Sequence, residues 1–394
     1  MEALNPDWTT YEDCVAYAQS LFEDLSYSYA SNWKSYSPER KIVGYLPLYV
    51  PREILAAQSV LPVGLFGAGN RLQVVRGDAY FQSYICHLPR TVVEMALGGY
   101  LDDFDGFIFP SICDVIRNLS GIFRLKRPEA YVKYLDFPQN FDPQVGGVYY
   151  RLELEKLSRD LERLNGVTLE PETLNQAIRL YNRNRALLNQ LDELRSREPH
   201  RITATEFYLF RRAGQVLSGE DCNRFWQRVI DSSAQVQREP EDKIRVVIAG
   251  SFCEQPPLGL IKTIENAGCY IVDDDFQLGL HWFSEALAED TSDPLDVLVK
   301  AYLTRSPASA AVYATSDKKG AALRAKVAAR RADGVIFCAP SFCDPALLDR
   351  PFLEQALDQE HIRHFSFQYH ENLGQFHVIK EQAGTFADMI KLWE

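Results

Sequence analysis

The chain has 394 residues, 46% hydrophobic and 24% charged, which is an ordinary globular composition and more length than one core usually holds. A net charge of −12 disfavours nucleic acid as a main partner, because phosphate binding requires a basic surface. The sequence shows neither a run of roughly 18 apolar residues that could span a bilayer nor the start of a secretory signal. We therefore expect a cytoplasmic protein that binds neither nucleic acid nor membrane.

Segment 1–40 is aromatic-rich and polar, and we expect it to be helical. From 41 to 146 short apolar runs alternate with helical stretches, which is typical of a parallel sheet covered on both faces. The expected strands are 42–46, 61–66, 106–109 and 131–135, and the expected helices are 51–57, 87–98 and 114–124. This part is predicted to be a first α/β domain.

Residues 147–242 have a different pattern, which predicts a helical insert. Leucines at helical spacing run to Gly166, a good C-cap position, and a second long helix stops before Pro199. Thr203 and Glu206 are spaced as a capping box for a third helix.

Residues 243–394 again alternate and predict a second α/β domain. The expected strands are 246–249, 270–272, 334–337 and 364–367, and the expected helices are 257–267, 293–303, 318–331, 345–358 and 380–392. The fold class is therefore α/β, with two doubly wound parallel sheets and a helical segment between them. Asp273-Asp274-Asp275 is interpreted as a solvated loop, with a cation site as the alternative, and the basic helix 318–331 as a solvated face.

A short phrase recurs three times, each time just past an apolar strand, as Ser-Ile-Cys-Asp at 111–114, Ser-Phe-Cys-Glu at 251–254 and Ser-Phe-Cys-Asp at 341–344. The first and third copies share the lead-in Asp-Gly-hydrophobic, at 105–109 and 333–337. Repetition over more than two hundred residues suggests two similar halves. Each would carry a thiol at the carboxyl end of a strand, where open α/β sheets place their chemistry.

The chain has eight cysteines, and a reducing cytoplasm makes disulfides unexpected. Cys14, Cys222 and Cys269 are interpreted as structural, and the candidates are Cys86, Cys113, Cys253, Cys338 and Cys343. Helices are expected to follow several of them, with Asp114 and Asp344 as N-caps, so that the helix dipole would favour a thiolate.

Three thiolates from two domains could hold three irons of a cubane and leave the fourth iron open. The alternative, buried structural cysteines, is weighted equally, because Cys-x-x-Cys pairs are absent and Cys338 with Cys343 matches no common cluster spacing. The repeat alone would nominate Cys113, Cys253 and Cys343. Zinc lacks a convincing histidine. The sequence also lacks a Walker-type phosphate loop, so we do not expect the chain itself to bind ATP.

With these residues assembled, the chain resembles the 2-hydroxyacyl-CoA dehydratase and benzoyl-CoA reductase family from about Lys41 onward. The resemblance is carried by Cys86 before a helix, by 105–114, by 333–345 and by a closing pattern from Gly374-Gln375 to Phe386. It implies two flavodoxin-like domains with a [4Fe–4S] cluster between them, bound by Cys86, Cys113 and Cys343. Cys253 is then expected to pack beside the cluster, and it is the first alternative as a ligand.

Segments 251–260 and 269–279 look most like the benzoyl-CoA reductase branch, and within it a non-ATPase subunit, either the C/gamma or the B/beta type. The resemblance implies anaerobic, ATP-driven reduction of an aromatic acyl-CoA to a cyclic dienoyl-CoA. The implied partners are a homologous cluster-bearing subunit, ATP-hydrolysing activator subunits and ferredoxin as the upstream donor. The alternatives are a 2-hydroxyacyl-CoA dehydratase subunit with the same cluster and a cluster-free scaffold subunit.

Overall fold

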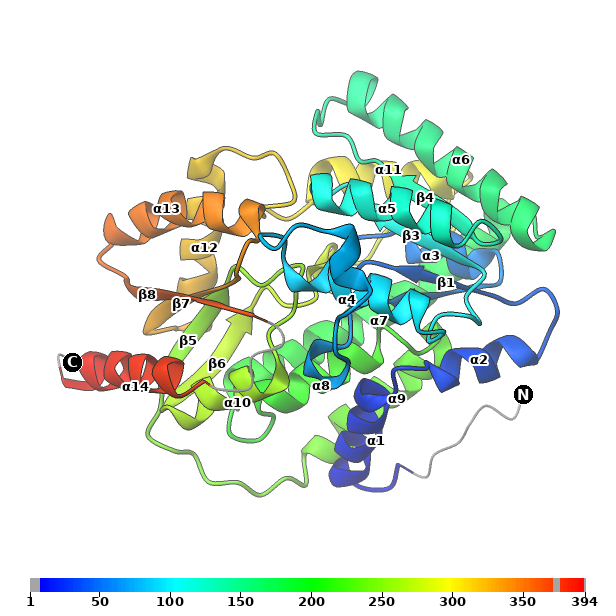
Figure 1. Ribbon diagram of the computed structural model, residues 1–394. Coiled ribbons are helices and arrows are strands. Elements are labelled where there is room, and N and C mark those ends of the chain that lie inside the picture. Colours follow the sequence, from blue (N-terminus) through cyan, green and yellow to red (C-terminus); the bar gives the residue numbers. More distant parts are fainter. Residues whose placement is uncertain (1–7, 371–375, 393–394) are drawn as a thin grey trace.

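The computed structural model describes residues 8–370 and 376–392 (Figure 1). The family's closing pattern begins at Gly374-Gln375, outside the described residues, as does the start of segment 1–40. The described part of that segment is helical, as expected, with α1 at Tyr11–Glu23 and α2 at Ser28–Ser35. Thr10 and Asp13 form a capping box that starts α1.

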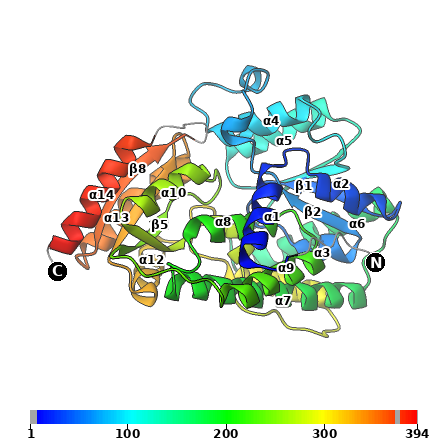
Figure 2. The ribbon, with the colours of Figure 1, turned by 90° about the horizontal axis from the view of Figure 1, so that it is seen from below.

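The first sheet has four parallel strands in the order β2-β1-β3-β4. Its strands are β1 (Lys41–Tyr45), β2 (Val60–Gly64), β3 (Gly106–Pro110) and β4 (Tyr131–Leu135). The connections contain α3 (Arg52–Ala57), α4 (His87–Leu97) and α5 (Asp114–Lys126), with short helices η1 (Gly69–Arg71) and η2 (Gly77–Tyr80). Figure 2 shows α4 and α5 on one side of β1 and β2, and α3 on the other.

The second sheet repeats this topology in the order β6-β5-β7-β8, again all parallel. Its strands are β5 (Ile244–Ala249), β6 (Cys269–Asp274), β7 (Gly334–Pro340) and β8 (Arg363–Tyr369). Its covering helices are α10 (Leu258–Asn266), α12 (Ser316–Arg330), α13 (Asp344–Asp358) and α14 (His377–Leu392). Two parallel sheets of the same strand order fit the expected pair of flavodoxin-like units.

The repeated Asp-Gly lead-in has the same structural role in both sheets. The Asp105 carboxylate accepts the N–H of Ile42 at 2.8 Å, and the Asp333 carboxylate accepts the N–H of Arg245 at 2.6 Å. Each aspartate thereby ties the start of the third strand to the start of the first strand of its own sheet. The repeat is therefore a sheet-building device as well as the approach to a cysteine.

The middle of the chain forms the expected helices, which are α6 (Val148–Asn165), α7 (Pro171–Arg197), α8 (Ala204–Ala213) and α9 (Gly219–Ser233). A short π-helix, η3 (Pro143–Gly147), precedes α6. Gly166 ends α6 at φ 78°, and Thr203 with Glu206 forms the predicted capping box. The long helix α7 contacts both α3 and β6, so it joins the two sheets (Figure 2).

The segment that follows β6 crosses back to the first sheet. It contains η4 (Leu278–His281) and α11 (Pro294–Arg305), and α11 contacts α6, α7 and η3. Tyr302 of α11 packs against Tyr150 of α6 with ring centroids 4.5 Å apart, and Tyr49 stacks on Trp282 at 5.2 Å. Residues from beyond 242 thus pack in one aromatic cluster with a residue that follows β1 and with α6. The expected domain boundaries at 40, 146 and 242 stay a prediction.

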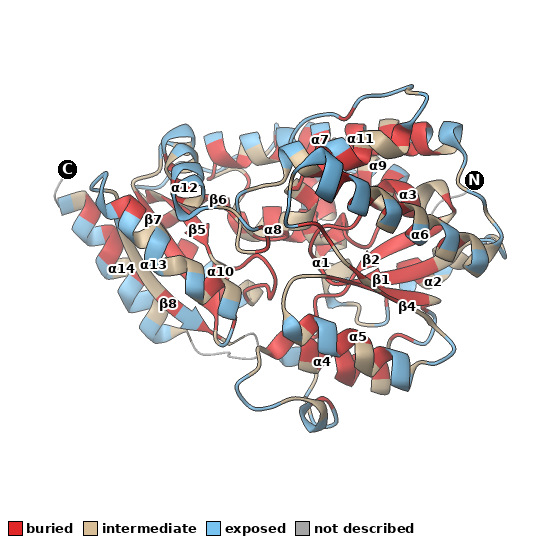
Figure 3. Cartoon of the chain, turned by 90° about the horizontal axis from the view of Figure 1, so that it is seen from above, coloured by how far each residue is buried: buried red, intermediate tan, exposed pale blue. Residues whose placement is uncertain are grey.

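Burial is concentrated along the strands and on the sheet-facing sides of the helices (Figure 3). β2, β3 and β7 are buried throughout, as expected of strands covered on both faces. Among residues 8–370 and 376–392, the structure contains no helix with the length and apolarity needed to cross a bilayer.

The interpretation of residues 273–275 as a solvated loop is wrong. Asp273 and Asp274 end β6 and are each 7% exposed. The Asp274 carboxylate pairs with Arg195 of α7 at 2.5 Å and with Arg211 of α8 at 2.8 Å. Asp273 pairs with Lys326 and Arg330 of α12, at 2.8 and 2.7 Å. The basic helix 318–331 is therefore only partly a solvated face, since two of its cations fasten it to β6.

Candidate functional site

Cys113 and Cys343 occupy equivalent places in the two sheets. Cys113 follows β3 and is the N-cap residue of α5, and Cys343 follows β7 and is the N-cap residue of α13. α5 starts at residue 114 as predicted and α13 starts one residue earlier than predicted, and in both helices the aspartate is the first helical residue and not the expected N-cap. The repeat therefore delivers two thiols to helix N-termini, where the dipole and free N–H groups favour negative charge.

Cys86 reaches a third helix N-terminus from the connection between β2 and β3. It is the N-cap residue of α4, which begins at His87 as the sequence indicated. Cys86 and Cys113 are each partly buried, and Cys343 is 8% exposed. The helices behind all three cysteines point their positive ends at the thiols.

These thiols lie within electrostatic range of one another, because ionising one of them would disfavour ionising the others. Burial raises the pKa of Cys86 well above its usual value, and the charges of Glu254, Cys253, Cys343 and Cys113 raise it further. Burial likewise raises the pKa of Cys343 to about 12, with Glu254 and Cys113 among the further causes. Residues from remote parts of the sequence thus share one buried, thiol-rich region.

Cys253 belongs to the same region. It is 8% exposed, and burial followed by the charges of Cys343 and Cys113 raises its pKa. It lies beyond β5, the first strand of the second sheet, whereas Cys113 and Cys343 lie beyond third strands. Cys338 instead lies within β7, and Cys14, Cys222 and Cys269 are buried inside other elements.

Thiolates are the usual ligands of iron–sulfur clusters, so the residues that would hold a cluster here are Cys86, Cys113 and Cys343. Among the described residues, no three or more His, Cys, Asp and Glu side chains gather around one ion position. A cubane spreads its protein ligands over different irons, so the thiols need not converge on one point. Backbone N–H groups of Val115 and Ile116 hydrogen-bond to Cys113, and that of Ala346 to Cys343, and hydrogen bonds of this kind tune the reduction potential of a cluster.

Sequence reasoning missed one charged residue of this region, Glu254. It is 2% exposed and its carboxylate accepts the N–H of Leu88, in the first turn of α4, at 2.9 Å. The repeated phrase contained the signal, because the acid after the cysteine is Glu in the second copy and Asp in the other two.

A largely apolar cavity of about 310 Å³ is lined by neighbours in sequence of two of the cysteines, although none of its described lining residues is a cysteine. Phe252, next to Cys253, and Ala346, in the first turn of α13, are among its lining residues, together with Ala249, Leu278, Leu323 and Leu353. It lies between the carboxyl half of β5 and the helices α12 and α13, and the carboxyl ends of strands are the usual ligand position in this fold.

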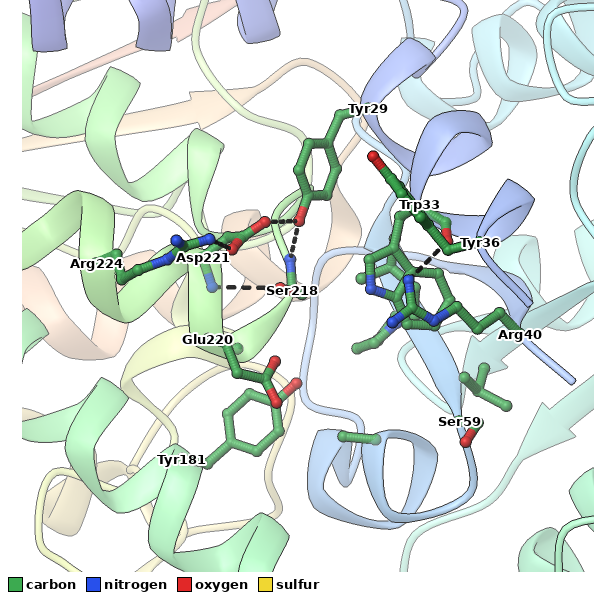
Figure 4. Close-up of a pocket in the computed structure, with 15 residues that line it drawn as sticks. Tyr29, Trp33, Tyr36, Arg40, Ser59, Tyr181, Ser218, Glu220, Asp221 and Arg224 are labelled. Atoms are coloured by element: carbon green, nitrogen blue, oxygen red, sulfur yellow. Dashed lines mark hydrogen bonds and ion pairs between the residues drawn. The ribbon is translucent and has the colours of Figure 1, made fainter. Parts of the chain in front are cut away.

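A larger cavity, of about 580 Å³, lies elsewhere (Figure 4). Its wall includes Val60 at the start of β2, the end of the strand opposite to the thiols. Tyr29 donates to Asp221 at 2.6 Å, and the Arg40 guanidinium lies 4.6 Å from the centre of the Trp33 ring. We place the candidate site at the thiols and not here, because parallel sheets hold their chemistry at the carboxyl ends of strands.

The chain is similar in sequence to subunits of several known enzymes. The chain is 47% identical over 382 residues to the C-type subunit of benzoyl-CoA reductase from Thauera aromatica, covering 97% of this chain and 99% of that protein. It is 24% identical over 351 residues to the (R)-phenyllactyl-CoA dehydratase beta subunit of Clostridium sporogenes, covering 89% and 92%. It is 25% identical over 355 residues to the beta subunit of (R)-2-hydroxyglutaryl-CoA dehydratase from Acidaminococcus fermentans, covering 89% and 93%.

These relatives are named as subunits, which indicates enzymes built from several chains. Residues 47–390 match the family described as 2-hydroxyglutaryl-CoA dehydratase, D-component. The resemblance read from Cys86, from 105–114 and from 333–345 is thereby confirmed at the level of the family. The chain belongs to the 2-hydroxyglutaryl-CoA dehydratase D-component family and is an enzyme subunit of oxidoreductase type.

Proposed function

We propose that this chain is a cluster-bearing, non-ATPase subunit of an ATP-dependent benzoyl-CoA reductase, of the C or gamma type. The observation that carries the proposal is the grouping of thiols from both sheets at three helix N-termini, in a chain 47% identical to the C-type subunit of benzoyl-CoA reductase. The reaction is the anaerobic reduction of an aromatic acyl-CoA to a cyclic dienoyl-CoA in the cytoplasm.

In this proposal Cys86, Cys113 and Cys343 hold a [4Fe–4S] cluster. A bound cluster would supply one-electron transfer at low potential. The chain's own contribution is to hold the thiols, to supply N–H donors from Val115, Ile116 and Ala346 to sulfur, and to keep water away from the region. The apolar cavity lined by Phe252 and Ala346 is the proposed entry for the acyl group.

The proposed partners follow from the same assignment. They are a homologous second cluster-bearing subunit, activator subunits that hydrolyse ATP, and a ferredoxin that supplies electrons. The missing Walker-type loop in this sequence supports that division of labour.

The ligand assignment is tested by iron and sulfide analysis of protein purified without oxygen. We expect iron to be lost when Cys86, Cys113 or Cys343 is changed to Ser, because each thiolate is a ligand. The matched control is Cys253→Ser, which removes a thiol of the same region and is expected to keep the iron. Loss of iron from Cys253→Ser with retention in Cys86→Ser would overturn the assignment.

The reaction is tested by assaying the assembled complex without oxygen, with benzoyl-CoA, ATP and a strong reductant. Formation of a dienoyl-CoA with ATP consumed in every turnover is the expected result. The relatives named as dehydratase beta subunits favour one second candidate, a 2-hydroxyacyl-CoA dehydratase subunit. ATP use confined to an initial activation, followed by many ATP-free turnovers on a 2-hydroxyacyl-CoA, would identify that activity instead.

A further inference from the structure

The acid that follows the cysteine differs between the three copies of the repeated phrase. Asp114 starts α5 with its side chain 90% exposed, and Asp344 starts α13 and is also exposed. Glu254 is 2% exposed. Two copies therefore place their acid at a helix start in water, whereas the middle copy buries a carboxylate, which costs free energy unless the carboxylate is hydrogen-bonded.

The buried carboxylate reaches across from the second sheet to the first. Glu254 lies between β5 and α10, and its Oε2 accepts the N–H of Leu88, the second residue of α4, at 2.9 Å. The N-cap residue of that helix is Cys86. Glu254 thus caps the N-terminus of α4 from 166 residues away, by accepting a backbone N–H that the side chain of an N-cap Ser or Asp usually accepts.

The loop that carries Glu254 is itself held in place. The Tyr369 hydroxyl, at the end of β8, donates to the backbone carbonyl of Glu254 at 2.6 Å, and Tyr369 is fully buried. The start of α4 is therefore connected through Glu254 to the edge of the sheet that presents Cys343. Since Cys86 and Cys343 come from different sheets, this connection fixes one against the other.

The charge of Glu254 also reaches the thiols. It is the first cause after burial for the raised pKa of Cys86, and a further cause for Cys253 and Cys343. An ionised carboxylate in a buried region acts strongly on nearby groups, because solvent screens its charge little. Such a charge disfavours the addition of an electron to a nearby centre.

We propose that Glu254 is a positioning residue that holds Cys86 against the second sheet and lowers the reduction potential of whatever centre the thiols bind. The second half of this inference rests on the proposed function, and the first half does not. Each half has its own measurement, so that failure of one is separable from failure of the other.

The first measurement uses the metal-free chain and the rate at which iodoacetamide alkylates each cysteine, resolved by peptide mass spectrometry. Glu254→Ala removes the cap from α4, so we expect Cys86 to react at least about five-fold faster, the factor that loss of a typical cap implies. Glu254→Gln keeps an acceptor oxygen for Leu88 but removes the charge that helps to raise the pKa of Cys86, so we expect it to react faster than the parent and more slowly than Glu254→Ala. Cys269, inside β6, is the internal reference.

The second measurement uses the anoxically loaded protein and a redox titration followed by its visible spectrum. We expect Glu254→Gln to keep its iron and to shift the midpoint potential upward, because it removes charge and little else. Glu254→Ala is expected to lose iron to a chelator faster than the parent does.

Glu265→Gln is the matched control for both measurements. Glu265 is another buried glutamate that caps a helix from a distance, since its carboxylate accepts the N–H of Ala204 in α8 at 2.8 Å. It belongs to α10, away from the thiols, so its change should alter neither the reactivity of Cys86 nor the potential.

Faster alkylation of Cys86 in Glu254→Ala than in Glu254→Gln supports the positioning role even if the parent binds no iron, a result that would contradict the proposed function alone. Equal alkylation rates in the two variants overturn the positioning role. An unchanged potential in Glu254→Gln, or a shift no larger than that of Glu265→Gln, overturns the effect on the centre.

Discussion

The two sheets share a plan but differ in what ends their outer strands. In both, an Asp-Gly pair starts the third strand, the aspartate bonds the first strand, and a cysteine follows at a helix N-terminus. β2 of the first sheet ends in Val63-Gly64, whereas the corresponding β6 ends in Asp273-Asp274. The two units therefore place Cys113 and Cys343 in the same way but are attached to the middle helices in different ways.

That difference decides how each sheet is fastened to α7. The second sheet uses its own strand, through Asp274 with Arg195 and Arg211. The first sheet uses a covering helix, through the buried pair of Glu53 in α3 and Arg185 in α7. We therefore expect the second sheet to depend more heavily on buried charge.

The largest effect is expected from Asp274→Ala. It leaves Arg195 and Arg211, each 1% exposed, without their shared carboxylate, and removing one partner of a buried pair typically costs about 3–5 kcal/mol. The free energy of unfolding from urea titration measures the loss.

Glu53→Ala is the comparison variant, and it should cost less. It affects a single arginine, and Arg185 keeps a hydrogen bond to the Asn182 side chain at 2.8 Å. Equal losses for the two variants would show that the sheets depend on buried charge to the same degree.

Local patterns in the sequence were sufficient to predict most of the fold. Each predicted strand and helix of the two sheets is present among the described residues, with ends shifted by a few residues, because hydrophobic period and capping residues are read within one element. The repeat placed Cys113 and Cys343 correctly at strand ends, because the same Asp-Gly lead-in performs the same hydrogen bonding in both sheets.

Interactions across the chain could not be read in this way. From the local sequence Asp274 is expected to be solvated, because its partners Arg195 and Arg211 lie 79 and 63 residues away along the chain. Glu254 likewise finds Leu88 166 residues away. Cys86 is a candidate because it precedes an expected helix, but its choice over Cys253 comes from the family resemblance, since its surroundings contain no copy of the repeated phrase.

An acid-dependent loss of stability is expected to belong to the second sheet's attachment. Burial and the charge of Arg211 lower the pKa of His281 from 6.5 to about 4. The folded state therefore keeps His281 neutral while the unfolded chain gains a proton below pH 6.5, so stability falls as the pH drops from 6.5 to 4. The shift corresponds to about 3 kcal/mol over that window.

His281→Gln removes this titration, so we expect its stability to fall less steeply than that of the parent across the same window. Urea unfolding at pH 6.5, 5.5 and 4.5 measures both slopes. Parallel pH dependences in the two proteins would place the acid sensitivity on other groups.

The smallest effects on stability are expected from adding a Cβ to the glycine of the shared Asp-Gly lead-in. They test whether this glycine is packed equally tightly in the two sheets. A Cβ at Gly106 would lie 2.9 Å from both the Cβ and the carbonyl oxygen of Tyr131, and one at Gly334 would lie 2.6 Å from the end of the Phe386 ring. Overpacking of this kind typically costs about 1–3 kcal/mol. Gly106→Ala should lie at the upper end, because a carbonyl oxygen and a Cβ move only with the strand, whereas the Phe386 ring can shift.

Gly121→Ala in α5 is the control for the alanine itself. A Cβ there would meet open space among the described residues, and replacing Gly by Ala within a helix typically stabilises it by up to about 1 kcal/mol. Thermal or urea unfolding of the three variants orders them. If Gly334→Ala proved the more damaging, the carbonyl oxygen of Arg363, 3.0 Å from the added Cβ, and not the Phe386 ring, would set the limit in the second sheet.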